Sequence, residues 1–543
     1  MVFARRSTTL LAAIIASCAM VLSLTACTSD NKTVVDGQTT VTSNSAGGVA
    51  VFTPSDGITL NQQTPLNKWA KLVPDLAKAL ADAGFKKGDI NHTTSDSLDK
   101  QSRAIQDFVV DHLSNNTTDD SGIAIAPDNM TLLVAPVVEA DASTRQYGDY
   151  VSQNLSTNDV TDEGATSDGE SSEDDSSKDD SSNTESDSTA SDEQAQAVDR
   201  LVSSLKLAKE SGMHVVLLGN SIEGYKPDAF VKFSDAQTIG KLQAEKMVSK
   251  LKLDKASKDN PKYIEVLLPY TAVDEKGNAN DSTFAQEAFR GIWQVLGSYY
   301  QKGVVESPSG TLDGKSTEND WQAVAYDAAK EGSTAKVLDK RLAKTDGQST
   351  LTRIDGIITM NDYIASEVVK ELDDLGYTGS AADINPQITI SGIVGNITGK
   401  KDLSRDAVPD PIKSPENDNA NDSSSSDDDA DKDTSASDKD RDSQWPLVTG
   451  YGAYVSNIPS IVNGKQWMTG MEDRQTIATD IAQACAKLNK DEALNSMPSI
   501  RNSEVGGVKK IPTINEPLLA VSAGNLKSAL IDPGYISLAD AGL

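Results

Sequence analysis

The sequence predicts an α/β protein in which two lobes, each with a parallel sheet, follow one another along the chain. Short apolar runs such as Met130–Val138 and His214–Leu218 have the composition of buried parallel strands. Segments with apolar residues at helical spacing alternate with these runs. Two such series meet near residue 230, which indicates two lobes. At 543 residues, the chain is long enough for each lobe to have its own core.

The same patterns place the individual elements. The predicted strands lie at 49–53, 130–138, 214–218, 263–268, 357–358, 388–390, 447–450, 467–469 and 518–521. The predicted helices lie at 66–85, 96–113, 195–212, 235–251, 284–300, 321–342, 362–375, 458–462, 474–488 and 526–530.

The clearest candidate binding position lies in the stretch Asp355–Gly379. There a short apolar strand runs into Asn361 and Asp362, and an amphipathic helix follows at once. In parallel α/β sheets, ligands bind beyond the carboxyl ends of the strands, and both residues stand at such an end. Either residue could instead only cap the helix by accepting a backbone N–H.

The formal net charge of -31 is concentrated in two tracts. Residues 151–200 contain 15 acidic and 2 basic side chains, and residues 404–443 contain 13 acidic and 5 basic ones. Such segments cannot bury a core, so we expect disordered acidic insertions at 156–193 and 402–443. The rest of the chain has ordinary acidity, and no basic stripe with aromatic residues indicates nucleic-acid binding.

The N-terminus has the pattern of an export signal. Arg5 and Arg6 precede an apolar run that ends in Leu24-Thr25-Ala26-Cys27. This ending resembles the lipobox of bacterial lipoproteins, which implies cleavage before Cys27, acylation of that cysteine and attachment to the extracytoplasmic face of the cell membrane. Residues 28–47 are polar and are expected to form a flexible tether. Cys485 is then the last free thiol, expected to be buried, and no metal site or cofactor is indicated.

The order of motifs behind this signal resembles the type I solute-binding proteins of ABC transporters, particularly the xylose- and ribose-binding group. The stretches that carry the resemblance are Pro65–Lys71, Met130–Val138, Ser234–Ala244, Met360–Asp362, Thr449–Ala453, Gly464–Gln466 and Leu526–Tyr535. The resemblance implies two Rossmann-like lobes joined by a hinge, with crossover segments near residues 230, 450 and 490. The implied divisions are 48–232 for the N-terminal lobe, 233–470 for the C-terminal lobe, 471–510 for a return to the first lobe and 511–543 for a second crossing.

In this family a sugar lies between the lobes, held by polar side chains and an aromatic wall. A sugar has hydroxyls at its edge and C–H groups on its faces, which explains that combination. The family placement favours Asn361 as a ligand-binding residue, with Asp362 as a second candidate. The candidates for the aromatic wall are Trp69, Trp467, Tyr363 and Tyr451, although each could equally be a core residue.

Several positions depart from the family's pattern. Asn220 follows Gly219 where Asp-Arg is common, Gly452 stands in place of an Asp, and Glu472 stands where Lys or Gln is usual. The charged groups that clamp sugar hydroxyls are thus largely absent. We keep Asn220 and Glu472 as candidate ligand-binding residues. The set also includes Gln63, in the loop before the first helix, and Arg290, on the helix at 284–300.

Two functions remain open from the sequence. The first is a monomeric, membrane-anchored receptor that binds a small polar solute, with carbohydrate as the leading class, and delivers it to an ABC transporter permease. The second is a non-transporting surface sensor or interaction lipoprotein that keeps a degenerate form of the fold. An enzyme is disfavoured because no nucleophile elbow, zinc-protease motif or P-loop is present.

Overall fold

The computed structural model describes residues 34–35, 38–39, 46–55, 65–115, 125–138, 146–151, 153–156, 185–273, 280–343, 351–381 and 445–543. The lipobox, Gln63, the predicted strand at 388–390, residues 157–184 of the first acidic tract and all of the second lie outside these ranges. Residues 1–44 form one unit, in which β1 (Val34–Val35) pairs antiparallel with β2 (Gln38–Thr39). Residues 45–543 form the other unit, which contains both lobes.

The N-terminal lobe is built on a seven-stranded sheet. In spatial order its strands are β17 (Ile500–Val505), β18 (Val508–Asn515), β9 (Ala229–Lys232), β7 (His214–Leu218), β5 (Met130–Val134), β3 (Gly48–Pro54) and β4 (Ile90–Ser95). All pairings are parallel except that of the hairpin β17–β18. The lobe's sheet therefore draws strands from both ends of the chain.

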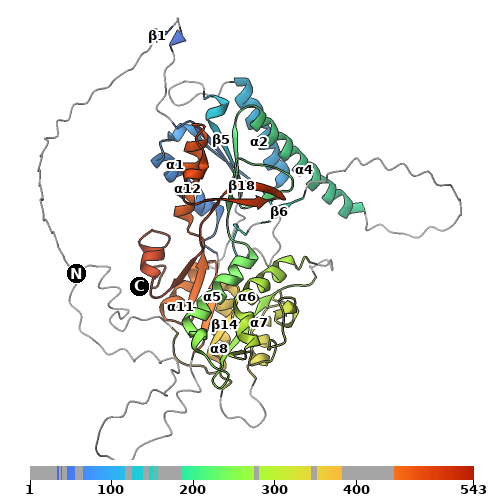
Figure 1. Ribbon diagram of the computed structural model, residues 1–543, viewed down its shortest axis with the longest axis vertical. Coiled ribbons are helices and arrows are strands. Elements are labelled where there is room, and N and C mark those ends of the chain that lie inside the picture. Colours follow the sequence, from blue (N-terminus) through green and yellow to red (C-terminus); the bar gives the residue numbers. More distant parts are fainter. Residues whose placement is uncertain are drawn as a thin grey trace, which may run out of the picture. The chain divides into compact units, whose positions relative to one another are not determined.

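Helices cover both faces of this sheet (Figure 1). On one face, α1 (Trp69–Asp82) and α12 (Arg474–Leu488) pack against Val49 and Leu133. On the other, α2 (Leu98–Asn115) and α4 (Glu185–Glu210) pack against the neighbouring residues Ala50 and Leu132. Successive side chains of a strand point to opposite faces, so the central strands must be apolar throughout. This is why Met130–Val134 is buried along its whole length.

The C-terminal lobe has a six-stranded sheet of the same kind. In spatial order its strands are β12 (Val305–Glu306), β10 (Lys262–Val266), β14 (Gly356–Ile358), β15 (Leu447–Tyr451), β16 (Met468–Met471) and β19 (Leu519–Ser522). Only the pairing of β16 with β19 is antiparallel. β15, which corresponds to the predicted strand at 447–450, lies between β14 and β16.

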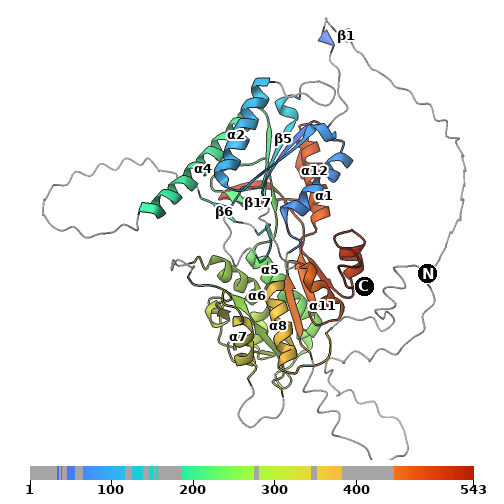
Figure 2. The same cartoon turned by 180° about the vertical axis from the view of Figure 1, so that it is seen from behind.

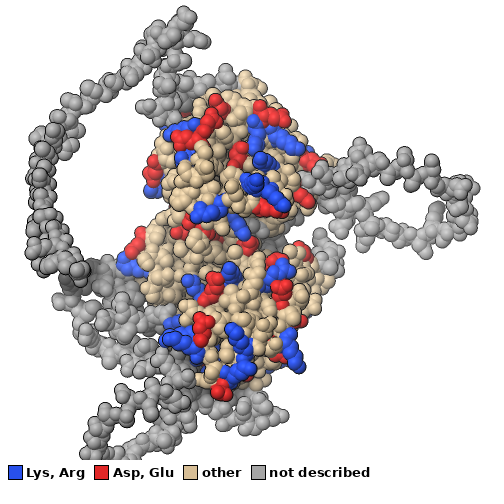
Figure 3. Space-filling view, viewed as in Figure 1, with Lys and Arg blue, Asp and Glu red and all other residues tan. Residues whose placement is uncertain are grey.

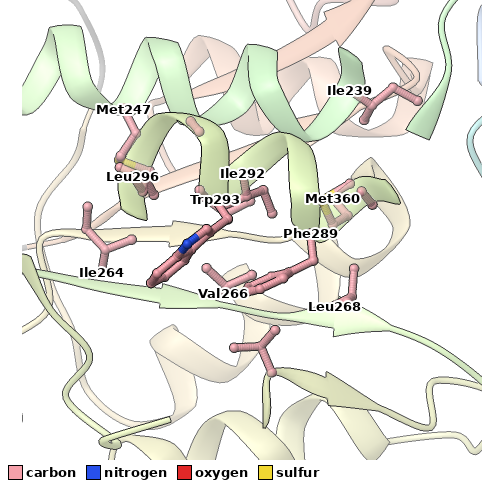
Figure 4. Close-up of a cluster of buried hydrophobic side chains, with 14 of the residues drawn as sticks. Ile239, Met247, Ile264, Val266, Leu268, Phe289, Ile292, Trp293, Leu296 and Met360 are labelled. Carbon is pink, nitrogen blue, oxygen red and sulfur yellow. The ribbon is translucent and has the colours of Figure 1, made fainter. Parts of the chain in front are cut away.

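This second sheet is also covered on both faces. The helices α5 (Ala236–Leu251) and α6 (Thr283–Gln301) cover one face, and Figure 4 shows Phe289, Ile292 and Trp293 of α6 packed over Ile264 and Val266 of β10. On the other face, α7 (Ser333–Arg341) and α8 (Asp362–Asp374) pack against β14 and β15. The short helix α11 (Ile458–Val462) and the π-helical turn Lys527–Ile531 pack beside β16 and β19.

Within the described residues, the chain passes between the lobes three times. The first crossing follows β9 and leads to α5, the second joins β16 to α12, and the third joins β18 to β19. The expected crossovers near 450 and 490 are wrong, because residue 450 lies inside β15 and residue 490 follows α12 within the N-terminal lobe. The expected division at residue 511 falls inside β18, which stays in the N-terminal sheet as far as Asn515.

Two predicted helices differ most from the observed structure. The helix predicted at 321–342 is a 3-10 turn at Asp320–Ala323, a strand β13 (Ala325–Tyr326) paired with β11 (Leu268–Pro269), and then α7. Gly332, with φ of 69°, adopts the left-handed conformation that a continuous helix cannot contain. The helix predicted at 195–212 is α4, which begins earlier, at Glu185 near the end of the first acidic tract. The extension is favourable because adding turns to an existing amphipathic helix costs less free energy than starting a new helix.

The remaining elements are short. They are β6 (Asn154–Leu155) paired with β8 (Ser221–Ile222), and 3-10 turns at Lys87–Asp89, Pro127–Asn129, Leu253–Lys255, Val455–Asn457 and Leu494–Ser496. Among the described residues, no helix has the length and apolar character to cross a membrane.

Candidate functional site

Polar side chains stand at the carboxyl ends of strands in both sheets. In the N-terminal lobe, Asn220 follows β7. In the C-terminal lobe, Asn361 follows β14, Tyr451 ends β15 and Glu472 follows β16. All four are 7% exposed or less. The candidate residues therefore stand at the carboxyl edges of the sheets, where they are buried and make contacts within the protein.

Asn361 serves both as a helix cap and as a contact to the other lobe. Its Oδ1 accepts a hydrogen bond from the N–H of Ile364 at 2.9 Å, which is the N-cap bond of α8. Its Nδ2 donates to Oε1 of Gln146 at 3.1 Å. Gln146 belongs to the segment that follows β5 of the N-terminal lobe. The two interpretations of Asn361 are thus compatible, since each uses a different atom of the amide.

Asp362 has its carboxylate committed to the C-terminal lobe. Oδ2 accepts from the N–H of Tyr454 at 2.9 Å and from Oγ1 of Thr469 at 2.8 Å, and Oδ1 accepts from Nε2 of Gln466 at 2.7 Å. Burial raises the pKa of Asp362 to about 6, although these donors act to lower it. A Cβ at Gly450 would lie 2.2 Å from Oδ1, so the glycine makes room for the carboxylate. These contacts give Asp362 a structural role.

Asn220 holds two loops of the N-terminal lobe together. Its Nδ2 donates to the carbonyl oxygen of Pro136 at 2.9 Å, and its Oδ1 accepts from the N–H of Gln153 at 3.0 Å. Pro136 and Gln153 flank the segment that contains Gln146. Asn220 therefore fixes the two ends of this segment against the end of β7.

Glu472 and Tyr451 form a buried polar cluster with Ser234 at the first two crossings. Oε1 of Glu472 accepts from the N–H of Ser234 at 2.6 Å and from the hydroxyl of Tyr451 at 3.3 Å. The Tyr451 hydroxyl also lies 2.5 Å from Oγ of Ser234. Burial raises the pKa of Glu472 to about 7, and the nearby Asp235 adds to the rise while the hydrogen bonds oppose it.

The aromatic candidates lie in different places. Trp69 is 3% exposed and packs edge-on against Tyr150 and Phe233, with ring centroids 5.0 and 5.7 Å away. Trp467 is buried in the core of the C-terminal lobe, and Tyr363 is half-buried on α8. Trp69 and Tyr451 therefore stand beside the crossings, whereas Trp467 and Tyr363 belong to the packing of one lobe.

Arg290 forms an ion pair with Glu287, one turn earlier on α6.

A shallow groove of about 270 Å³ lies between the ends of α1 and α12 and contains none of the candidate residues. It is lined by Ala83, Gln483, Ala486, Lys487, Lys490 and Glu492.

Residues 146–151, Gln-Tyr-Gly-Asp-Tyr-Val, were not predicted to contribute to the site. This segment contacts Asn361 through Gln146 and Trp69 through Tyr150, so it reaches candidate residues of both lobes. The signal that could have revealed it is compositional. Two tyrosines and a valine occur within six residues, immediately before a polar tract that cannot bury a core. Aromatic residues in such a place indicate a segment that packs against the folded body.

Comparison with known proteins gives likenesses among solved structures only. No family model matches the chain, and no curated protein matches it. An ABC transporter solute-binding protein from Clostridium phytofermentans with bound β-D-glucose is 17% identical, with 91% of this chain and 99% of that chain covered and a TM-score of 0.44. A carbohydrate transporter solute-binding protein from Chloroflexus aurantiacus in complex with D-glucose is 18% identical, with 92% and 98% covered and a TM-score of 0.42.

A periplasmic ribose ABC transporter protein from Conexibacter woesei is 13% identical, with 90% and 96% covered and a TM-score of 0.42. The fold class is established by the sheets themselves. Two mostly parallel α/β sheets, between which the chain crosses three times, form the architecture expected of a type I periplasmic binding protein.

Proposed function

We propose that this chain is a lipid-anchored, extracytoplasmic solute-binding protein of an ABC transporter. It binds a small polar ligand between its lobes, with carbohydrate as the leading class, and delivers the ligand to a permease. The lipobox at Leu24–Cys27 supports the anchor, and the two-lobed fold supports closure about the crossings. The proposal includes no catalysed reaction.

The observation that carries the proposal is the hydrogen bond between Asn361 and Gln146. It brings together polar groups that follow strands of the two lobes, at the sheet edges where α/β proteins bind ligands. A ligand at this position can contact both lobes at once, and such contacts stabilise a closed state over an open one.

The chemistry of the neighbouring groups suits a polyhydroxylated molecule. The Asn361 amide and the Tyr454 hydroxyl both have hydrogen-bonding groups directed toward Gln146. The rings of Phe284 and Tyr451, against which Tyr147 packs, supply flat apolar surfaces in the same place. On the face in Figure 3, basic and acidic side chains are interspersed, so that face has no single-sign field to attract a polyanion.

Thermal-shift measurements on the full chain test this function. The panel contains pentoses, hexoses, oligosaccharides, nucleosides and amino acids, and one class should raise the melting temperature saturably. Asn361→Ser should abolish the rise, because serine preserves the helix cap but lacks the amide N–H that reaches across to Gln146. Asn502→Ala, at an exposed position on β17, is the control and should respond like the natural chain.

The anchor has its own test. In cells supplied with a labelled fatty acid, Cys27→Ala should lose the label and leave the membrane fraction. Cys485→Ala should retain both, since that thiol is buried in the N-terminal lobe. Membrane association that survives Cys27→Ala would contradict lipid anchoring at this cysteine.

A second candidate function is a surface sensor or interaction lipoprotein that no longer binds a transported solute. The observation that favours it is that the candidate groups on both lobes already contact the chain's own segment 146–151. No response to any solute at millimolar concentration, in the natural chain and in variants of that segment, would favour this second function.

A further inference from the structure

The segment Gln146–Val151 is attached firmly to the N-terminal lobe. Asp149 forms an ion pair with Lys68 at 2.8 Å and accepts from the N–H of Trp69 at 3.1 Å, where α1 begins. The N–H of Asp149 donates to the carbonyl oxygen of Asn67 at 2.8 Å. Asp149 thus supplies the first turn of α1 with the acceptor that a capping residue would otherwise provide.

The other end of the segment is held by the C-terminal lobe. Gln146 accepts from Asn361 through its side chain, and its carbonyl oxygen accepts from the Tyr454 hydroxyl at 2.6 Å. The Tyr147 ring lies 4.7 Å from that of Phe284 and 6.3 Å from that of Tyr451, measured between centroids. Tyr147 is 1% exposed and belongs to the core of the C-terminal lobe, although the chain enters it from the N-terminal lobe.

The segment Gln146–Val151 also covers Trp69, one of the candidates for the aromatic wall of a sugar site. The Tyr150 ring packs against Trp69 and, at 4.8 Å between centroids, against Phe233 of the first crossing. Its hydroxyl donates to the carbonyl oxygen of Lys68. In Figures 1 and 2, the strand β6 that follows the segment lies on the side of the N-terminal lobe that faces the C-terminal lobe.

We infer that Gln146–Val151 is an intramolecular occupant of the interlobe site, which bridges the two lobes in the absence of solute and must leave before a solute can bind. This inference rests on the proposed function and adds a form of self-regulation to it. A bound solute closes a two-lobed protein by contacting both lobes, and this segment makes contacts of the same kind. It satisfies the hydrogen-bonding groups and covers the aromatic rings that a solute would need.

The covalent connection gives the segment an advantage over a free solute. A tethered group competes at an effective concentration in the millimolar range, so a solute must overcome that occupancy. The apparent affinity of the site is its intrinsic affinity multiplied by the fraction of molecules in which the segment is displaced. Weak binding by the natural chain and tighter binding by a variant that lacks the segment's contacts are the expected consequences.

The experiment measures the separation of the lobes and solute binding on the same variants. Spin labels at Gln106→Cys on α2 and Lys370→Cys on α8 report the interlobe distance, since both positions are exposed and Cys485 is fully buried. The double variant Gln146→Ala/Tyr147→Ala removes the amide contact and the ring but leaves Asp149 at α1. We expect a broader and longer distance distribution, and solute affinity about tenfold higher or more.

Matched variants separate this effect from a general loss of packing. Tyr225→Ala removes a similarly buried tyrosine that packs only within the N-terminal lobe, and it should leave the distance distribution unchanged. If the double variant does not fold, Gln146→Ala and Tyr454→Phe, each of which removes a single hydrogen bond, should still shift the distribution in the same direction.

The outcomes distinguish the two proposals. A wider distribution together with gained solute binding supports both. A wider distribution with no solute response supports the occupant and counts against solute binding as the function. An unchanged distribution, or equal solute affinity in the natural chain and the double variant, overturns the occupant whatever the solute panel shows.

Discussion

The N–H of Ser234 donates to Oε1 of Glu472 at 2.6 Å, and this bond links the first crossing between the lobes to the second. The N–H of Glu472 in turn donates to Oδ1 of Asn67 at 3.4 Å, just before α1. Through its carboxyl group and its backbone N–H, Glu472 thus joins three segments at the place where the lobes meet. Any rotation of one lobe against the other has to preserve this cluster or break it.

The raised pKa of Glu472 predicts a pH dependence of stability. Its pKa is about 7 in the folded protein against 4.5 for an ordinary glutamate, so the folded state keeps the proton at pH values where the unfolded state releases it. The contribution of Glu472 to the free energy of unfolding should therefore fall by roughly 3 kcal/mol as the pH rises from about 4.5 to about 7, and then remain level. Denaturant unfolding of the natural chain and of Glu472→Gln across this range measures the difference.

Glu504→Gln, at an exposed position of β17, controls for the loss of one carboxylate. Asp362 has a raised pKa and contributes a slope of the same sign to every variant, so only the difference between natural chain and variant isolates Glu472. Parallel stability curves for the natural chain and Glu472→Gln would show that this carboxyl titrates normally.

We predict that the main effect of removing the Asp362 carboxyl group is a loss of folding stability. Asp362→Ala removes a buried acceptor from the N–H of Tyr454, the Gln466 amide and the Thr469 hydroxyl. We expect a loss of about 3 kcal/mol or more in the free energy of unfolding. Chemical denaturation measures it, with the exposed Asp374→Ala on the same helix as a control that should change stability by less than about 0.5 kcal/mol. Lost solute binding with unchanged stability would instead make Asp362 a ligand residue.

Gly148 is predicted to be required for the segment 146–151 to approach α1. Its φ is 101°, and a Cβ there would lie 2.6 Å from both the Cβ and the carbonyl oxygen of Asn67. Gly148→Ala should therefore cost about 2 kcal/mol or more, through backbone strain and the clash together. Gly224→Ala is the matched control, because its φ of 69° is also left-handed but its Cβ would meet nothing within 4 Å. Calorimetric unfolding compares the two, and equal losses would mean that the approach to Asn67 contributes nothing.

The sequence predicted the elements whose stability depends on local pattern. The helix at 474–488 and the strand at 214–218 match the structure residue for residue, because their apolar spacing is a direct consequence of facing a core. β4 was missed for the opposite reason. Its residues Ile90–Ser95 form a mostly exposed edge strand, so no buried face leaves a pattern in the sequence.

The sequence by itself also determined that Asn361 begins a helix at the carboxyl end of a strand, since a cap and a strand end are local features. Only the tertiary structure decided what the amide meets. Gln146 is 215 residues away, and no local pattern predicts that a segment beside an acidic tract contacts residues of both lobes. Likewise, the carboxyl groups of Asp362 and Glu472 became structural because burial and distant donors, both products of packing, set their pKa values and their partners.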